Sequence, residues 1–335
     1  MSVLYRTYRP SKWSEVIGQD QVVDPLKDSI SNKRIAHAFL FSGSRGTGKT
    51  SVARIFAKAL GSKDEDIYEI DAASNRGIDD IRSLREHVSV LPFSSDYKIY
   101  IIDEVHMLSK DAWNALLKTL EEPPKHVIFI LATTELDKVP DTIVSRCQTF
   151  FFKKPNREII RKMIVDVAKK EGYELDSGAD DLIALLGDGS FRDALGMLQK
   201  VISTSSDKKI SREEVESITG SPKSDLVNNF IESLVNKNCD QALVALNNVE
   251  KSGISVILFA TLVLEKMRFI LMVQHSVSSK NSIKDRVSPD DWVFITKHTG
   301  VTPAMLTILI DATNSVGRSK IEILPLELAT VKICQ

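Results

Sequence analysis

Eight residues near the start of this 335-residue chain read Gly43-Ser44-Arg45-Gly46-Thr47-Gly48-Lys49-Thr50. The run fits the pattern GxxxxGK[ST], in which glycines allow backbone N–H groups to wrap around phosphates. Lys49 would reach the β- and γ-phosphates of a nucleotide, and Thr50 would hold a magnesium ion. An apolar run over 38–41 precedes the motif and a helical pattern over 51–60 follows it. Because this context explains the motif better than a chance glycine-rich turn does, we predict a phosphate-binding loop.

A second element suited to phosphate chemistry is an acidic pair at the end of an apolar run. Residues 99–102 read as a strand and continue directly into Asp103-Glu104. Asp103 would lie beside the phosphate-binding loop and help to coordinate magnesium, while Glu104 would orient and polarise an attacking water. The alternative is a strand that ends in a solvated acidic turn. The loop upstream favours the catalytic interpretation.

The pattern over residues 1–155 predicts an α/β nucleotide-binding domain. Short apolar runs alternate with helical patterns, and the runs cover 38–41, 67–70, 99–102 and 127–131. Continuous apolar strands separated by helices indicate a parallel sheet that is buried on both faces.

A helical pattern replaces this alternation after about residue 155. Helices that begin at Asn156, near residue 177 and at Ser190 predict a small lid domain over 156–220. A polar loop is expected over 203–211, before a capping box at the start of the next helix.

The last third of the chain predicts an all-α domain over 221–335. Gly220-Ser221-Pro222 is a plausible boundary before it. Long apolar stretches follow, and Ser288-Pro289 has the composition of a helix start.

Three further side chains are candidates for the phosphate site, and the residues alone leave their roles open. Arg146 could be an arginine finger or an ordinary surface or salt-bridged arginine. Arg192 lies in the first turn of a helix, where a cation opposes the helix dipole, so either a phosphate or Asp193 would be its partner. Thr134 follows the fourth strand, where a hydroxyl could bond the attacking water, although threonine is also common at strand ends.

Composition is that of an ordinary globular protein, with 43% hydrophobic and 27% charged residues. No stretch approaches the roughly 18 apolar residues of a membrane span, and the polar, basic N-terminus is not a secretory signal. We therefore expect a cytoplasmic protein without membrane contact.

The net charge of −1 neither supports nor excludes nucleic-acid binding, so any DNA contact would be local or shared among subunits. The three cysteines form no metal-like spacing.

In this order the motifs resemble those of the AAA+ ATPases. Their residues are similar to those of the clamp-loader γ/τ subunits of bacterial DNA polymerase III. The resemblance is dense over about residues 1–200 and thins over the C-terminal helices, which match the family's collar domain mainly by position. The matching stretches are 5–10 (YRTYRP), 16–19 (VIGQ), 37–43 (HAFLFSG), 69–75 (EIDAASN), 103–108 (DEVHML), 114–124 (NALLKTLEEPP), 131–134 (LATT), 145–147 (SRC) and 191–194 (FRDA).

The resemblance implies ATP and Mg²⁺ as cofactors and gives roles to matching positions. It implies Walker A residues at Lys49 and Thr50, Walker B residues at Asp103 and Glu104, sensor 1 at Thr134, sensor 2 at Arg192, and at Arg146 a finger that acts on ATP in the neighbouring subunit. It also implies that an N-terminal segment packs around adenine, through Arg6, Tyr8, Arg9, Val16 and Ile17.

The function implied is ATP-driven loading of the β sliding clamp onto primer–template DNA during replication. The implied partners are further copies of the chain with δ and δ′ subunits in a ring of five, the clamp and the DNA. Arg76, which lies beside a glycine, could touch the DNA backbone or belong to a solvated loop.

The chain departs from the family pattern in two places. Relatives usually carry a four-cysteine zinc module where only 61–66 (GSKDED) stands here, so we expect no zinc, whether the module is naturally absent or deleted. The chain also ends at Gln335, without the C-terminal domains of the longer τ form, which suggests a γ-length form or a fragment.

Two other functions fit parts of the pattern. A branch-migration motor of the AAA+ class would move DNA alone and would typically end in a winged-helix domain, whereas the C-terminal third here reads as helices. A non-catalytic scaffold like δ′ would have a broken phosphate loop, whereas Lys49 and Asp103-Glu104 are intact.

Overall fold

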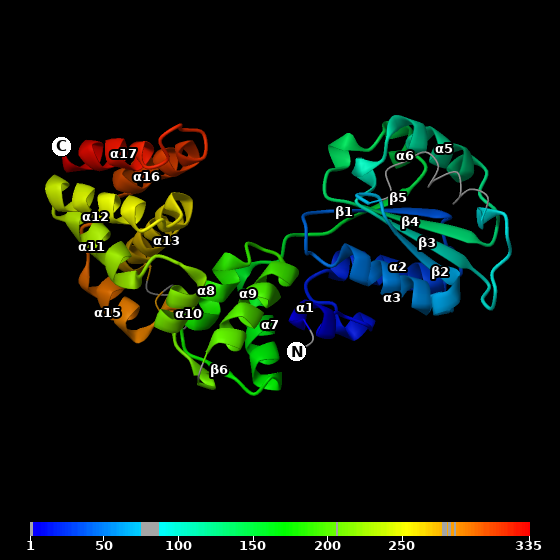
Figure 1. Cartoon of the computed structure of the whole chain (residues 1–335), viewed down its shortest axis with the longest axis horizontal. Coiled ribbons are helices and arrows are strands. Elements are labelled where there is room, and N and C mark those ends of the chain that lie inside the picture. The colour runs from blue at the N-terminus through cyan, green and yellow to red at the C-terminus, as the bar shows by residue number, and fades with distance from the viewer. Residues whose placement is uncertain (1–2, 75–86, 206, 277–279, 281–282, 285) are drawn as a thin grey trace. The chain divides into compact units, whose positions relative to one another are not determined.

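The computed structural model describes residues 3–74, 87–205, 207–276, 280, 283–284 and 286–335. The chain divides into two compact units (Figure 1). The first unit comprises Met1–Ile160 and Gly187–Gly196, and the second comprises Arg161–Leu186 and Met197–Gln335. The three domains expected from the sequence, with limits at 155 and 220, stay a prediction.

A five-stranded parallel sheet forms the centre of the first unit, in the order β2-β3-β4-β1-β5. Its strands are β1 (Ala38–Ser42), β2 (Ile67–Asp71), β3 (Lys98–Asp103), β4 (Val127–Thr133) and β5 (Gln148–Phe151). β1 and β4 are buried along their whole length, as continuous apolar runs predict. The α/β fold class with a parallel sheet is therefore confirmed.

Helices cover both faces of this sheet (Figure 1). On one face, α2 (Asp20–Ser31) and α3 (Lys49–Ala59) contribute Leu26 and Phe56 to a core that also contains Phe39 and Phe41 of β1. On the other face, α5 (Lys110–Glu121) buries Trp113 and Leu116. Short helical segments in the described part of this unit include α1 (Leu4–Thr7), α6 (Asp141–Val144), η1 (Trp13–Glu15), η2 (Asp64–Asp66), η3 (Val105–Met107) and η4 (Leu136–Lys138).

The second unit is mainly helical, as the sequence predicts after residue 155. Its helices, as far as the structure describes them, include α7 (Arg157–Lys170), α8 (Ala179–Leu186), α9 (Phe191–Thr204), α10 (Arg212–Thr219), α11 (Ser224–Val235), α12 (Cys239–Lys251), α13 (Val256–His275), α15 (Pro289–Lys297), α16 (Pro303–Val316) and α17 (Leu324–Cys334). Of these, α7 and α9 begin in the first unit. Expected helix starts are confirmed, because the hydroxyls of Ser190, Ser211 and Ser288 each accept a backbone N–H three residues later.

The prediction of a polar loop over 203–211 is wrong for the last residues of that range. Lys209–Ile210 forms strand β7, which pairs in parallel with β6 (Glu174–Leu175). Ile210 is fully buried, and a two-residue strand is too short to show an alternating pattern in the sequence. Burial of this single side chain therefore decides the local structure.

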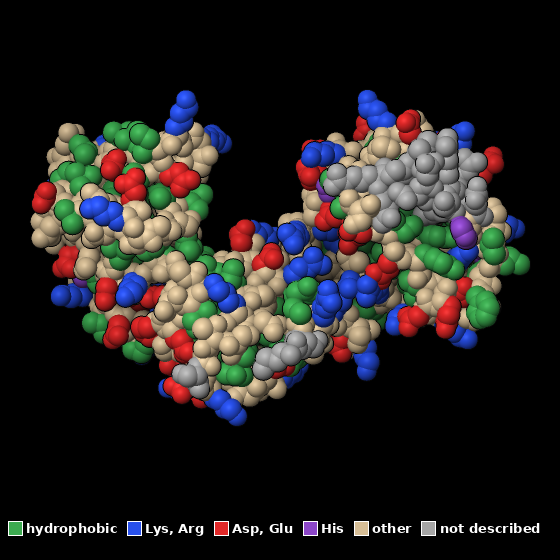
Figure 2. Space-filling view, viewed as in Figure 1, with side chains coloured by type: hydrophobic (Ala, Val, Ile, Leu, Met, Phe, Trp, Pro, Cys, Tyr) green, Lys and Arg blue, Asp and Glu red, His purple; other side chains and the backbone are tan. Residues whose placement is uncertain are grey.

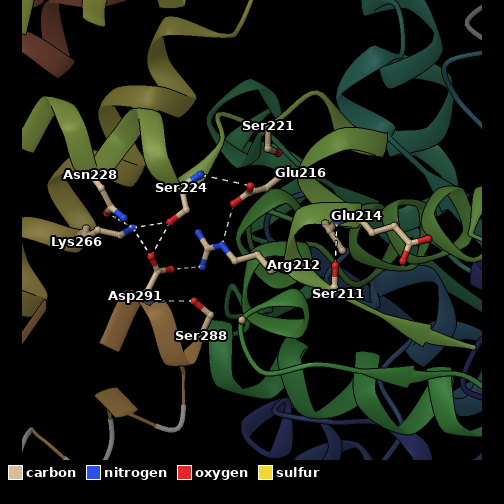
Figure 3. Close-up of polar contacts among 12 residues, drawn as sticks. Ser211, Arg212, Glu214, Glu216, Ser221, Ser224, Asn228, Lys266, Ser288 and Asp291 are labelled. Carbon is tan, nitrogen blue, oxygen red and sulfur yellow. Dashed lines mark hydrogen bonds and ion pairs between the residues drawn. The ribbon is translucent and has the colours of Figure 1, made fainter. Parts of the chain in front are cut away.

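A cluster of buried charges joins α10 to the helices that follow it in the second unit (Figure 3). Lys266 of α13 donates from Nζ to Asp291 Oδ1 (2.6 Å) and Asn228 Oδ1 (2.7 Å). Arg212 Nη1 lies 2.9 Å from Asp291 Oδ2, an ion pair without hydrogen-bond geometry, and its Nε donates to Glu216 Oε1 at 2.9 Å. Burial raises the pKa of Asp291, but attraction to Arg212 and Lys266 outweighs it and leaves the pKa below its usual value.

This cluster predicts a large loss of stability when the central carboxylate loses its charge. Asp291→Asn leaves the buried Lys266 without its ion-pair partner and leaves Arg212 with Glu216 alone, and breaking such a pair typically costs about 3–5 kcal/mol. The free energy of unfolding can be followed through Trp292 in α15, with Trp13 and Trp113 replaced by phenylalanine.

The matched control is Asp290→Asn, because Asp290 is exposed in the same first turn of α15. This control should change stability by no more than about 0.5 kcal/mol. Since the folded-state pKa of Asp291 is lowered, its contribution is present above the unfolded pKa of about 3.9 and is lost as the pH falls through the folded pKa. Equal effects of the two variants would contradict the prediction.

Candidate nucleotide-binding site

The predicted phosphate-binding loop lies between the end of β1 and the start of α3. Gly48 is the N-cap of α3 with φ +104°, in the left-handed region that favours glycine. Gly46 has φ +73°, and a Cβ there would lie 2.0 Å from Ser190 Oγ. Its carbonyl accepts the N–H of Phe191 at 3.0 Å. The loop therefore needs glycine both for its own conformation and for close approach to the start of α9.

Lys49 is only 5% exposed and turns back onto its own loop. Its Nζ donates to the carbonyls of Gly43 (2.7 Å) and Ser44 (3.0 Å). Burial lowers the pKa of Lys49, while Glu104 and Asp103 oppose that shift. The buried ammonium group therefore has carbonyl partners that an anionic ligand could replace.

The two elements predicted to share a metal ion meet in the fold. The hydroxyl of Thr50 donates to Asp103 Oδ2 at 2.6 Å. Their oxygens are hard donors of the kind that Mg²⁺ prefers, so this pair fits a divalent cation. The pairing depends on the parallel sheet, because β1 and β3 both end at this edge.

Glu104 lies next to Asp103 in a left-handed backbone conformation, with φ +50°. This conformation is uncommon for a residue other than glycine and is often found at functional sites. Its carboxylate accepts the hydroxyl of Thr134 at 3.0 Å. The structure thus brings together the predicted water-orienting acid and the predicted sensor-1 residue.

Arg192 and the N-terminal segment lie in the same unit as the loop. The Arg192 guanidinium is 5.8 Å from the centroid of the Tyr5 ring, and Arg9 Nε donates to Ser51 Oγ at 3.1 Å. Burial lowers the pKa of Arg9, and repulsion from Arg54 and Arg192 adds to the effect. Several cations therefore converge near the start of α3, which favours an anionic ligand there.

The other residues expected to surround adenine take more varied positions. Val16 packs against the core beside α2 and α3, Ile17 is 44% exposed, Tyr8 is half-buried, and Arg6 is exposed beside Tyr5. Their role toward adenine stays a prediction.

Arg146 lies at the end of α6, where its partners among the described residues belong to its own unit. Nη1 donates to Thr142 O (2.7 Å) and Nη2 donates to Glu121 Oε1 (2.8 Å). The side chain is 35% exposed. An ion pair at an exposed site is weak, so Glu121 can release this guanidinium at low cost.

Two residues with direct contacts in this site were not among the predicted site residues. Gln19, 1% exposed, donates from Nε2 to Lys153 O (2.8 Å) and accepts Lys153 N–H at Oε1 (3.1 Å). His106 lies beside Glu104 and Glu135. Both occur in the stretches that carry the family resemblance, which was the only sequence signal for them.

The remaining predictions from the sequence concern Arg76, zinc, the cysteines and membrane contact. Arg76 lies outside the described residues. Across the described parts of the chain, no group of three or more His, Cys, Asp or Glu side chains is arranged to hold a metal ion, and the absence of zinc stays a prediction. Burial raises the pKa of Cys147 to about 12, which suits an unreactive thiol. No helix in the described ranges is long and apolar enough to cross a membrane.

A glycine-rich loop between β1 and α3, an acidic pair at the end of β3 and a polar residue after β4 define a P-loop protein of the AAA+ class. The fold agrees with a solved structure of the Thermotoga maritima RuvB Holliday junction branch migration motor. The match has a TM-score of 0.54 at 20% identity and covers 68% of this chain and 79% of that one. At this identity the likeness concerns the fold alone.

Sequence comparison narrows the class to one family. The chain is 44% identical to DNA polymerase III subunit tau of Bacillus subtilis over 271 residues, which are 75% of this chain and 48% of that protein. It is 38% identical to subunit tau of Escherichia coli over 295 residues, 82% of this chain and 46% of that protein. A family model described as DNA polymerase III, delta subunit, matches residues 18–76 and 62–156. The chain therefore belongs to the DNA polymerase III γ/τ family, and it spans about half the length of these curated relatives.

Proposed function

We propose that the chain is an ATP-binding and ATP-hydrolysing subunit of a bacterial clamp loader, which places the β sliding clamp on primer–template DNA. The observation that carries the proposal is the contact of Thr50 with Asp103 beside the buried Lys49, in a chain 44% identical to a τ subunit. Intact phosphate-loop and acidic residues favour a catalytic subunit over a scaffold.

In this proposal each site residue has one task toward ATP. Lys49 exchanges its loop carbonyls for the β- and γ-phosphates, and Arg192 approaches the phosphates from the start of α9. Thr50 and Asp103 hold Mg²⁺, which neutralises charge on the phosphate oxygens when bound. The N-terminal segment around Tyr8 packs against the adenine.

Hydrolysis then depends on the acid after β3 and on a residue from the next subunit. Glu104 orients the attacking water and accepts its proton, while Thr134 fixes the carboxylate through the 3.0 Å hydrogen bond. Arg146, released from Glu121, stabilises the charge on the phosphoryl group of ATP bound to the neighbouring subunit.

Helix α17 supports assembly through the C-terminal helices. Leu324, Leu328 and Val331, which follow one another at helical spacing, are 37%, 63% and 38% exposed. An exposed apolar stripe on a helix is typical of a protein–protein interface. We propose that δ, δ′ and further copies of this chain pack here in a ring of five subunits.

The segment before β3 carries three exposed hydrophobic side chains within four residues. Val90, Leu91 and Phe93 are 57%, 73% and 86% exposed, and Figure 2 shows hydrophobic side chains on the surface near β2. Asp66, 1% exposed, accepts the N–H groups of Phe93 (2.6 Å) and Ser94 (2.9 Å). The patch is therefore held by buried hydrogen bonds although it faces solvent.

Lys98 fixes the other side of this segment by donating to the carbonyl of His87 at 2.7 Å. A rigid apolar projection loses little entropy on binding, so it is suited to insertion into an apolar pocket. We propose that residues 90–93 dock on the sliding clamp.

The proposed function predicts an ATPase that responds to its assembly. In a complex with δ, δ′ and clamp, primed DNA should increase ATP turnover severalfold, and a fluorescent clamp should become DNA-bound. Lys49→Ala should weaken ATP binding roughly 100-fold, since hydrogen bonds to charged groups are worth about 1.5–3 kcal/mol each. Binding can be measured with a fluorescent ATP analogue. An ATP turnover rate that is unchanged by clamp and primed DNA would argue against a clamp loader. Unwinding of DNA by the chain alone would favour a branch-migration motor.

A second prediction concerns the arginine that acts across subunits. Arg146→Ala should leave ATP binding unchanged and lower turnover in the complex about 1000-fold, the lower range for loss of an arginine finger. Arg34→Ala removes an exposed arginine of the same unit and serves as the control, with normal turnover. Normal turnover in the Arg146 variant would refute the finger role.

A third prediction tests the docking patch. Phe93→Ser should weaken clamp binding roughly 30-fold, because a hot-spot side chain contributes about 2 kcal/mol, and should leave ATP binding intact. Phe151→Ser is the matched control, since Phe151 is a 61% exposed phenylalanine of the same unit. Clamp affinity can be measured by surface plasmon resonance, and equal affinities of the two variants would exclude this surface.

A further inference from the structure

A buried histidine connects the acid of the proposed catalytic site to a second carboxylate. His106 lies in η3, directly after β3, and its side chain is 6% exposed. Its Nδ1 is 3.4 Å from Glu104 Oε2, and its Nε2 is 3.2 Å from Glu135 Oε1. The imidazole therefore fills the space between two carboxylates on different segments of the chain.

The groups around the ring determine which protonation state of His106 satisfies its contacts. The Thr133 hydroxyl donates to the carbonyl of Glu135 (3.2 Å) and accepts the N–H of Glu135 (3.0 Å). His106 Nδ1 lies 3.0 Å from this hydroxyl oxygen. With the hydroxyl proton directed at the carbonyl, Nδ1 is the donor in this contact, and a ring that carries a proton on both nitrogens can pair with Glu104 and Glu135 at once.

The carboxylate of Glu104 is thus held from two directions. Thr134 Oγ1 donates to Oε2 at 3.0 Å, and His106 Nδ1 approaches the same oxygen. Neither contact uses Oε1. The backbone of Glu104, with φ +50°, places this side chain next to Asp103. The orientation of the flexible carboxylate then depends on Thr134 and His106.

We propose that His106 is a positioning residue for Glu104. With a proton on both ring nitrogens, His106 pairs through Nδ1–H with Oε2 of Glu104, so that Oε1 is presented to the attacking water, and through Nε2–H with Glu135, which fixes the ring. Glu135 itself is tied to Lys138 by a 2.7 Å ion pair. The inference rests on the proposed ATP hydrolysis, and it adds a group that acts through Glu104 without touching ATP.

The test separates binding from turnover in the assembled complex. His106→Ala should lower kcat for ATP about 100-fold, the scale expected when a catalytic group is displaced by about 1 Å, with KM and the Kd for ATP within about twofold of the wild type. Replacement by amides distinguishes the two ring nitrogens. His106→Asn places an N–H near the position of Nδ1 and should restore much of kcat, whereas His106→Gln places it near Nε2 and should not.

A double variant tests whether His106 acts through Glu104. Glu104→Gln alone should nearly abolish turnover, and adding His106→Ala should cause no further loss, because groups that act as a unit are not additive. A normal kcat in His106→Ala, or equal rescue by Asn and Gln, would overturn the inference and leave the proposed function intact. A parallel loss of ATP binding would assign His106 a purely structural role. A wild-type complex that does not hydrolyse ATP would overturn the proposed function and this inference together.

Discussion

Parallel pairing of β4 between β1 and β3 is the constraint on which the site depends. The register pairs Phe41 with Ala132 and Ile101 with Ile130, so the three strands end together at one edge of the sheet. The phosphate loop follows β1, the acidic pair stands at the end of β3, and Thr134 follows β4. A shift of one residue would turn the buried side chains of a strand to the other face and would also separate Thr50 from Asp103.

Buried charge serves different purposes in the two units. In the second unit, the cations Lys266 and Arg212 are balanced by Asp291 and Glu216, and the cluster holds α10 against α13 and α15. In the first unit, Lys49 is equally buried but has only loop carbonyls as hydrogen-bond partners, with Asp103 and Glu104 nearby. Burial of a cation is costly without an anion. The charge cluster of the second unit therefore favours stability and geometry, whereas the buried Lys49 of the first unit favours an anionic ligand.

Contacts from two sides hold the carboxylate of Glu104, the residue that we propose as the general base. Thr134 and His106 approach one carboxylate oxygen, and His106 leads on to Glu135. Glu135 begins the segment that continues through α6 to Arg146. The segment that contacts the acid of one site therefore continues along the chain to the arginine that we propose for the next site.

The sequence by itself determined the parallel α/β class, the phosphate loop and the acidic pair, because continuous apolar runs and glycine spacing are local signals. It also gave most helix starts, since Ser190, Ser211 and Ser288 cap through residues three positions away. Sequence could not decide between a surface and a catalytic role for Arg146, nor reveal β7, His106 or the cluster around Asp291. These depend on side chains that are far apart in the chain, such as Arg212 and Asp291, and only the tertiary structure brings such groups within hydrogen-bonding distance.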